Sequence, residues 1–263
     1  GAADVNYAMP QGSYDSALAV PGEYGADING EIGNGATALH AAAEEGHAAV
    51  AALLLDRGAS HRARMAGVQP LALAVQYNRA EMVSLLLKRG ADPNDHSTSD
   101  GATALYYSSG HYLHEMTKLL LAGGADPNAV TFKHATPLFY ASGVGDLQTA
   151  KMLLAAGADP DIQTDELARP IHAAVEGGHT KIVRLLIKHG AQIEPAGPNH
   201  QTPLLLAALY GHSQIAADLL AQGADVNQPL ETTGAAPLAV AAQGGHAAVC
   251  ALLLGCGAAP DAR

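Results

Sequence analysis

Tryptophan is absent from this 263-residue sequence, and phenylalanine occurs only twice. A core built around bulky aromatic side chains is therefore not expected, although apolar residues make up 48% of the chain, too many for a disordered polymer. Charged residues are also few, at 15%, and 25 acidic residues outnumber 14 basic ones. The formal net charge of −11 argues against nucleic-acid binding, which needs a dense basic surface.

Cysteine is scarce as well. Cys250 and Cys256 are the only two, and they fall six residues apart in one expected helix, where their side chains point in different directions. No disulfide framework is expected, which favours a reducing, intracellular compartment, either cytoplasmic or nuclear. No apolar run is long enough to cross a bilayer, so we expect no membrane insertion.

One segment recurs seven times along the chain. The copies begin near residues 37, 69, 103, 136, 169, 202 and 236, and a Gly-Ala pair falls 21 residues after every start. Each copy is predicted to form two helices. Thr and Pro at the start suit the cap and first turn of the first helix, and a mid-repeat Gly, or Asn78 or Tyr112 in its place, ends it. The glycine of Gly-Ala ends the second helix, and polar Asp-Pro-Asn turns follow.

One such helix pair cannot bury its own apolar face, so the copies must stack. Small residues such as Ala42 and Ala74 recur on the first helix, where larger side chains would hold neighbouring helices apart. Leucine pairs on the second helix supply the main burial, at about 1.5–3 kcal/mol for each fully buried leucine. The fold class predicted is all-α: a single continuous solenoid of stacked helix-turn-helix units with β-turn finger loops, spanning residues 35–263.

The TPLH-like tetrad, the Ala-Ala, the Gly-His and the final LLxxGAD together resemble the ankyrin repeat. The resemblance covers seven complete repeats from Asn34 to the C-terminus. The third is the most divergent, with Tyr112-Leu113 in place of Gly-His. Residues 1–34 resemble a degenerate or incomplete N-terminal repeat, because Gly25 comes 12 residues earlier than the spacing requires.

The resemblance implies an interaction scaffold whose partners bind the concave face formed by the first helices and the finger loops. The helix residues that face a partner lie four, seven and eight positions after each repeat start; we name these positions the first-helix face. Four of the nine tyrosines fall there, and tyrosine is enriched at interface hot spots. The predicted partner-binding residues are Tyr77, Tyr107, His111, Tyr140 and Tyr210 on this face, and Arg62, Arg64, Phe132, Lys133 and His134 on the fingers. The alternative is that these tyrosines fill gaps between repeats.

No motif of catalysis accompanies the repeats: a phosphate-binding glycine loop, HExxH and GxSxG are all missing. Six of the 13 histidines recur at the tetrad or Gly-His position, which favours a structural role. His111 and His114 are three residues apart, but no third ligand at zinc-site spacing accompanies them. We therefore expect no catalytic residue, metal or cofactor, and a protein or peptide partner bound by part of a larger intracellular protein. The alternatives are an enzyme or small-molecule receptor with a Tyr/His-lined concave pocket, and a structural spacer.

Overall fold

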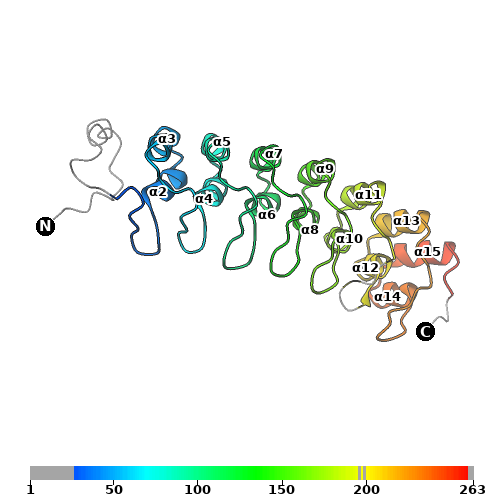
Figure 1. Cartoon of the computed structure of the whole chain (residues 1–263). Coiled ribbons are helices and arrows are strands. Elements are labelled where there is room, and N and C mark those ends of the chain that lie inside the picture. Colours follow the sequence, from blue (N-terminus) through cyan, green and yellow to red (C-terminus); the bar gives the residue numbers. More distant parts are fainter. Residues whose placement is uncertain (1–26, 195–196, 198–199, 260–263) are drawn as a thin grey trace. The chain divides into compact units, whose positions relative to one another are not determined.

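The computed structural model describes residues 27–194, 197 and 200–259 (Figure 1). Most of the predicted N-terminal repeat lies outside these residues and stays a prediction. The chain divides into two compact units, one of residues 1–108 and 115–126 and the other of residues 109–114 and 127–263. The boundary passes through the third repeat, so a single continuous solenoid also stays a prediction.

The described residues form fourteen helices, which occur as one pair in each of the seven predicted repeats. The first unit contains α2 (Ala38–Glu45), α3 (Ala48–Asp56), α4 (Pro70–Gln76) and α5 (Ala80–Lys88), and shares α6 (Ala104–Gly110) and α7 (His114–Ala122) with the second. The second unit contains α8 (Pro137–Val144), α9 (Leu147–Ala155), α10 (Pro170–Glu176), α11 (Thr180–Lys188), α12 (Pro203–Leu209), α13 (Ser213–Ala221), α14 (Pro237–Gln243) and α15 (Ala247–Gly255). The all-α prediction is confirmed.

Within each unit the helices form two layers (Figure 1). The first helices pack against one another, as α2 does against α4 and α8 against α10, and the second helices do the same, as α3 does against α5 and α13 against α15. The finger loops extend from the side of the first helices, and isolated β-bridges such as Ile32–Ala36 and Met65–Val68 close some of them. The first helices and the fingers therefore lie on the same side of each unit.

Both predicted helix ends are confirmed in all seven copies. The glycine of every Gly-Ala pair adopts a left-handed conformation, with φ between 85° and 95°. The mid-repeat position does so too, even where Asn78 (φ 57°) and Tyr112 (φ 58°) stand in place of glycine. Threonine caps the first helix in three copies, through Thr103, Thr136 and Thr202; Thr136 Oγ1, for example, accepts a hydrogen bond from the Phe139 amide at 3.1 Å.

The recurring small residue on the first helix is buried in every copy, as its proposed packing role requires. Ala74 and Ala141 have no exposed surface, and neither has Ser108, the one exception to alanine. The Ser108 hydroxyl lies 2.9 Å from Thr117 Oγ1 and donates to the Leu105 carbonyl at 3.0 Å. A matching threonine on the second helix therefore satisfies the buried hydroxyl that the substitution introduces.

The Asp-Pro-Asn loops have a role beyond turning the chain. Asn94 donates to the Gly124 carbonyl at 3.1 Å and accepts from the Asp126 amide at 2.7 Å. Asn128 makes the same two bonds to Gly157 (3.2 Å) and Asp159 (2.7 Å). The asparagine of each loop thus joins consecutive repeats by satisfying backbone groups just beyond the second helix.

Three of the recurring histidines, His40, His179 and His246, join neighbouring repeats by hydrogen bonds. His40 has no exposed surface, accepts from the Thr37 amide on Nδ1 at 3.1 Å and donates from Nε2 to the Val68 carbonyl at 3.3 Å. Burial lowers the pKa of His40 below its ordinary value, because the charged ring would lose its hydration. The Gly-His histidines His179 and His246 donate to first-helix carbonyls of the preceding repeat, at 3.1 and 2.9 Å. Arg79 replaces one of them and donates to the Glu44 carbonyl at 2.8 Å.

Candidate partner-binding surfaces

Large exposed apolar residues are concentrated on the first helices and the fingers. Tyr77, Tyr112, Leu209 and Tyr210 lie seven to nine positions after a repeat start, with exposures of 42%, 54%, 39% and 42%. Ile32, Phe132 and Leu167 lie on fingers, with exposures of 46%, 64% and 41%. Leu254, on the last second helix, is the remaining large hydrophobic residue in this class among the described residues.

Tyr77 ends α4 in the first unit and turns its hydroxyl toward the preceding repeat. The pKa of Tyr77 is raised, chiefly because its hydroxyl donates a hydrogen bond to the Glu44 carboxylate and then because that negative charge opposes ionisation. Glu45 and Tyr107 add smaller contributions of the same sign. Two of the predicted residues, Tyr77 and Tyr107, are therefore neighbours on one face of the first unit.

Tyr210 has the same environment in the second unit. Its hydroxyl donates to Glu176 Oε1 at 3.3 Å, and its ring stacks on His212 with centroids 6.0 Å apart and an interplanar angle of 26°. Burial, and then the Glu176 charge, raise the pKa of Tyr210. His212 differs from His179 and His246, since its buried Nε2 finds no hydrogen-bond partner among the described residues. Its ring supports Tyr210 instead.

Tyr140 is better explained by packing between repeats. Its ring lies over Gly110, where an added Cβ would come within 2.1 Å of Tyr140 Cε1. It also meets His111 edge-on, with centroids 5.9 Å apart. Tyr140 is half-buried and His111 is exposed, so the gap-filling alternative describes Tyr140, and His111 keeps an accessible ring.

On the first-helix face, the residue four positions after the repeat start is not exposed in every copy. Leu73 and Leu206 occupy it, and both are only 5% exposed. The prediction that this position faces a partner is therefore wrong for these two residues, because a leucine there turns into the helix layer. The seventh and eighth positions carry the exposed side chains.

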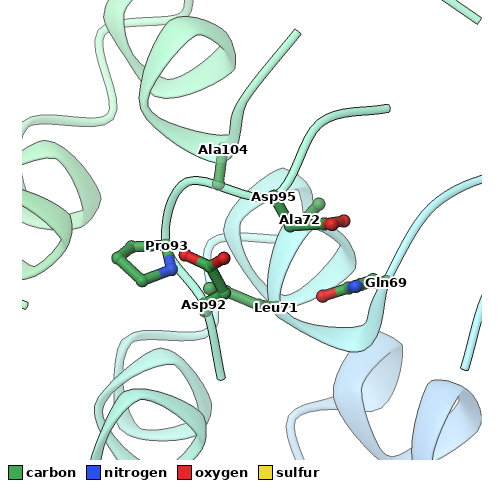
Figure 2. A pocket seen from close by; sticks show the side chains of 7 residues that line it. All are labelled: Gln69, Leu71, Ala72, Asp92, Pro93, Asp95 and Ala104. Atoms are coloured by element: carbon green, nitrogen blue, oxygen red, sulfur yellow. The ribbon is translucent and has the colours of Figure 1, made fainter. Parts of the chain in front are cut away.

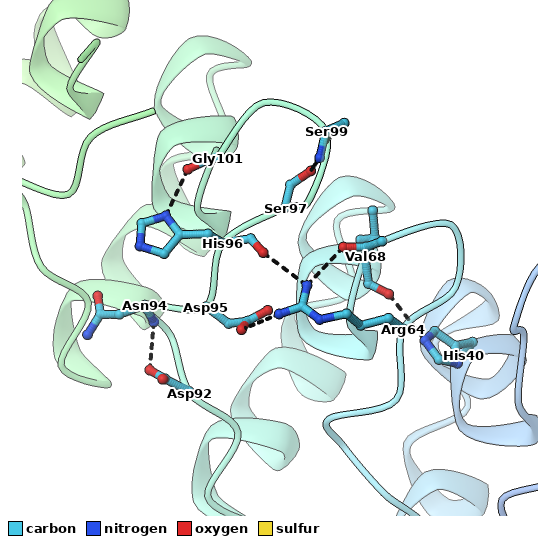
Figure 3. A network of polar contacts seen from close by, with 11 residues as sticks. His40, Arg64, Val68, Asp92, Asn94, Asp95, His96, Ser97, Ser99 and Gly101 are labelled. Atoms are coloured by element: carbon cyan, nitrogen blue, oxygen red, sulfur yellow. Dashed lines mark hydrogen bonds and ion pairs between the residues drawn. The ribbon is translucent and has the colours of Figure 1, made fainter. Parts of the chain in front are cut away.

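Arg64 holds one finger to the next in the first unit (Figure 3). Its guanidinium donates to the Gly67 and His96 carbonyls at 3.0 and 2.9 Å and pairs with Asp95 at 2.6 Å. His96 in turn bonds the Gly101 carbonyl through Nδ1 at 2.8 Å. Arg64 therefore stabilises the contact between two fingers. Arg62, also predicted to contact a partner, is exposed on the same loop.

Phe132, Lys133 and His134 form an exposed fingertip in the second unit. His134 Nδ1 lies 2.7 Å from Asp165 Oδ1, and the Asp165 amide donates to the Lys133 carbonyl at 3.2 Å. These bonds join two consecutive fingers. The next fingertip carries exposed Leu167, which holds a left-handed conformation (φ 66°) that non-glycine residues avoid.

The pair His111 and His114 does not form a shared site. His114 donates from Nε2 to Asp146 at 2.9 Å, while His111 meets Tyr140. Asp146 is only 3% exposed and also accepts from the Gln148 and Thr149 amides, both at 3.1 Å. In the described part of the chain, no group of three or more His, Cys, Asp or Glu side chains could hold a metal ion.

A small hollow lies between the second and third repeats of the first unit (Figure 2). Gln69, Asp92 and Asp95 supply its polar side chains, and its volume of about 10 Å³ is room for about one water molecule. Gln69 is 7% exposed, and its Oε1 finds no hydrogen-bond partner among the described residues. The hollow has neither the size nor the Tyr/His lining that a receptor for a small organic molecule would need.

The predicted contacts do not include four exposed residues of the first helices and fingers, Ile32, Tyr112, Leu167 and Leu209. Tyr112 was assigned only to the helix-ending turn, yet its hydroxyl donates to the Val144 carbonyl and it is the most exposed tyrosine among the described residues. Leu209 lies on the first-helix face, but the contacts predicted on that face are tyrosines and His111. Leu167 stands where other copies place Gly67 or Gly101, and that substitution is the signal that could have identified it.

No helix in the described ranges is long and apolar enough to cross a membrane. A family model that describes three consecutive ankyrin repeats matches the chain over four overlapping ranges, residues 6–97, 93–164, 138–230 and 200–263. The comparison with curated proteins found none that matches the chain.

Proposed function

Because the chain belongs to the ankyrin-repeat family, whose repeats are generally protein-interaction modules, we propose that it binds a protein or peptide partner on its concave face. The observation that supports this is the distribution of exposed apolar side chains. Seven of the eight large hydrophobic residues that the described part exposes lie on first-helix ends or fingers. Stacked helix pairs, whose leucines are buried between repeats, can present such residues at a low entropic cost.

Two further features bear on the type of module. We assign it no catalytic role, since His40 and His179 hydrogen-bond neighbouring repeats and His134 pairs with the next finger. We place it within a larger intracellular protein, in the cytoplasm or nucleus. The free cysteines, half-buried Cys250 and exposed Cys256, fit a reducing compartment.

The test is affinity capture from native lysate with three forms of the chain, followed by mass spectrometry. The face variant Tyr77→Ala/Tyr210→Ala removes exposed rings from both units and leaves Tyr140 in its packing position. The matched control, Lys118→Ala/Lys151→Ala, changes exposed second-helix residues. Far-UV circular dichroism establishes that all three forms are folded.

We expect a protein that the wild type and the control retain and the folded face variant loses. A protein retained equally by all three forms would move the interface away from the first-helix face. Capture of no specific protein, together with a ligand-induced rise in melting temperature from a metabolite library, would replace this proposal with a small-molecule receptor.

A further inference from the structure

The first-helix face carries one arrangement twice, a tyrosine beside a glutamate of the preceding repeat. In the first unit it is Tyr77 with Glu44, and in the second it is Tyr210 with Glu176. The register is the same in both. The tyrosine lies eight positions after its repeat start and the glutamate seven after the start before it. In each pair an exposed ring and a carboxylate thus lie side by side.

The charge around these pairs favours a cationic ligand. The 21 residues of the first-helix face include three glutamates and neither lysine nor arginine. Residues 190–262, which contain Tyr210, also lack lysine and arginine. A face of one sign attracts the opposite charge and selects against segments of its own charge.

We propose that the Tyr210–Glu176 pair binds an arginine side chain of the partner. This rests on the proposed function and names the chemistry that the partner brings. A guanidinium is planar, stacks on aromatic rings and pairs with carboxylates through several donors. Tyr210 is 42% exposed with His212 supporting its ring, and the Glu176 carboxylate can accept further hydrogen bonds beyond the one from Tyr210.

Leu209 adds an apolar contact to this site. It is 39% exposed and directly precedes Tyr210 at the end of α12. An arginine stem, or an apolar residue next to the arginine, can cover it while the guanidinium reaches the carboxylate. The segment expected is therefore basic with an apolar neighbour, rather than a uniformly charged run.

The Tyr77–Glu44 pair is the weaker of the two. Arg79 donates to the Glu44 backbone carbonyl at 2.8 Å, so a positive charge is held close to the backbone of that residue. The equivalent residue beside the second pair is His212, ten positions after its repeat start as Arg79 is. Without an arginine there, the Glu176 site keeps more of its attraction for a cation.

The probes are four pools of random peptides that differ only at one fixed central residue: arginine, lysine, citrulline or glutamate. Citrulline keeps the shape and stacking plane of arginine but carries no charge. Binding of each pool to the full chain is measured by fluorescence polarisation at low and at raised salt. Glu176→Gln and Tyr210→Ala are compared with Glu81→Gln, which changes an exposed glutamate on a second helix.

We expect the arginine pool to bind about tenfold more tightly than the citrulline pool, because the hydrogen bonds become charge-assisted. Glu176→Gln should abolish that preference, Tyr210→Ala should weaken both pools, and Glu81→Gln should change neither. The preference should shrink as salt rises.

Equal binding of the arginine and citrulline pools would overturn the inference and leave the proposed function standing. An arginine preference that survives Glu176→Gln would overturn it as well, as would a lysine pool that binds as tightly as arginine, since stacking by a planar group would then count for nothing. If no pool binds while a folded partner is captured from lysate in the Tyr-dependent manner described above, arginine recognition fails and the interaction module remains. If no peptide pool binds and no partner is captured from lysate, both arginine recognition and the proposed function fail.

Discussion

Removing the buried carboxylate of Asp146 tests how the fourth repeat is joined to His114 of the third. Asp146 replaces the histidine of Gly-His in the fourth repeat and caps α9. It accepts from the Gln148 and Thr149 amides at 3.1 Å, from Thr149 Oγ1 at 2.7 Å and from His114 Nε2 at 2.9 Å. With Asp146 3% exposed and Thr149 fully buried, water cannot replace these partners.

The magnitude follows from two losses. A missing N-cap costs about 0.5–2 kcal/mol. The buried Thr149 hydroxyl left without its acceptor costs about 1–3 kcal/mol more. Asp146→Ala should therefore lower the free energy of unfolding of the second unit by about 1.5–5 kcal/mol. Asp146→Asn keeps an oxygen for the cap and should cost about 1 kcal/mol.

The assay is equilibrium urea denaturation followed by far-UV circular dichroism. Hydrogen exchange at the α9 amides is needed as well, because stacked repeats need not unfold in one step. Gln148→Ala, an exposed change on the same helix, is the matched control and should stay within about 0.5 kcal/mol of wild type. A double-mutant cycle with His114→Ala then isolates the pair, for which we expect a coupling of about 1 kcal/mol.

Two results would refute this reasoning. One is a loss below about 1 kcal/mol for Asp146→Ala, which would mean that water or a rearranged turn replaces the carboxylate. The other is additivity of Asp146→Ala and His114→Ala, which would mean that the histidine contributes nothing beyond its own packing.

The remaining two predictions concern single residues. Leu167→Gly should raise the free energy of unfolding by about 0.5–1 kcal/mol, because glycine adopts the left-handed backbone of this exposed site without strain. The control Leu254→Gly, inside α15, should lower it by about 1 kcal/mol. Equal effects of the two substitutions in urea denaturation would contradict this prediction. The lowered pKa of His40 means that the unfolded chain binds a proton more readily than the folded one, so stability should fall as the pH drops below the unfolded pKa of about 6.5. Urea midpoints from about pH 7.5 to about 5.5 should show a smaller fall for His40→Gln, and an unchanged slope would refute the assignment.

The fold could be predicted because each feature of the repeat has a local physical cause. Glycine ends both helices, proline suits the first turn, and alanine permits close packing, so seven copies in one register leave little freedom in the helix boundaries. Asn78 and Tyr112 adopt the left-handed turn that the register assigned to them without being glycine. The repeat register therefore predicts the left-handed turn at positions where the residue type alone would not predict it.

The contacts between repeats were harder to predict, because they join residues about one repeat apart in a register that no single copy reveals. The asparagine of Asp-Pro-Asn was interpreted as a turn former, yet its amide bonds the next repeat. Arg64 is predicted from the sequence to contact a partner, yet its guanidinium bonds Asp95 and two backbone carbonyls of its own and the next finger. Polar loop residues such as Asn94 and Arg64 therefore form hydrogen bonds to the neighbouring repeat, which leaves fewer of their donors and acceptors for a partner.

The same register rule explains which face tyrosines remain accessible. A side chain eight positions after a repeat start reaches the residue seven positions after the previous repeat start. The identity of that preceding residue decides whether the tyrosine stays accessible. Tyr77 and Tyr210 meet Glu44 and Glu176, whose carboxylates hold the hydroxyls and leave the rings exposed. Tyr140, four after its start, instead covers Gly110, since glycine leaves room for a ring. Substituting Gly110 would displace Tyr140 without touching either Tyr–Glu pair. The packing tyrosine and the candidate binding tyrosines can therefore be separated experimentally.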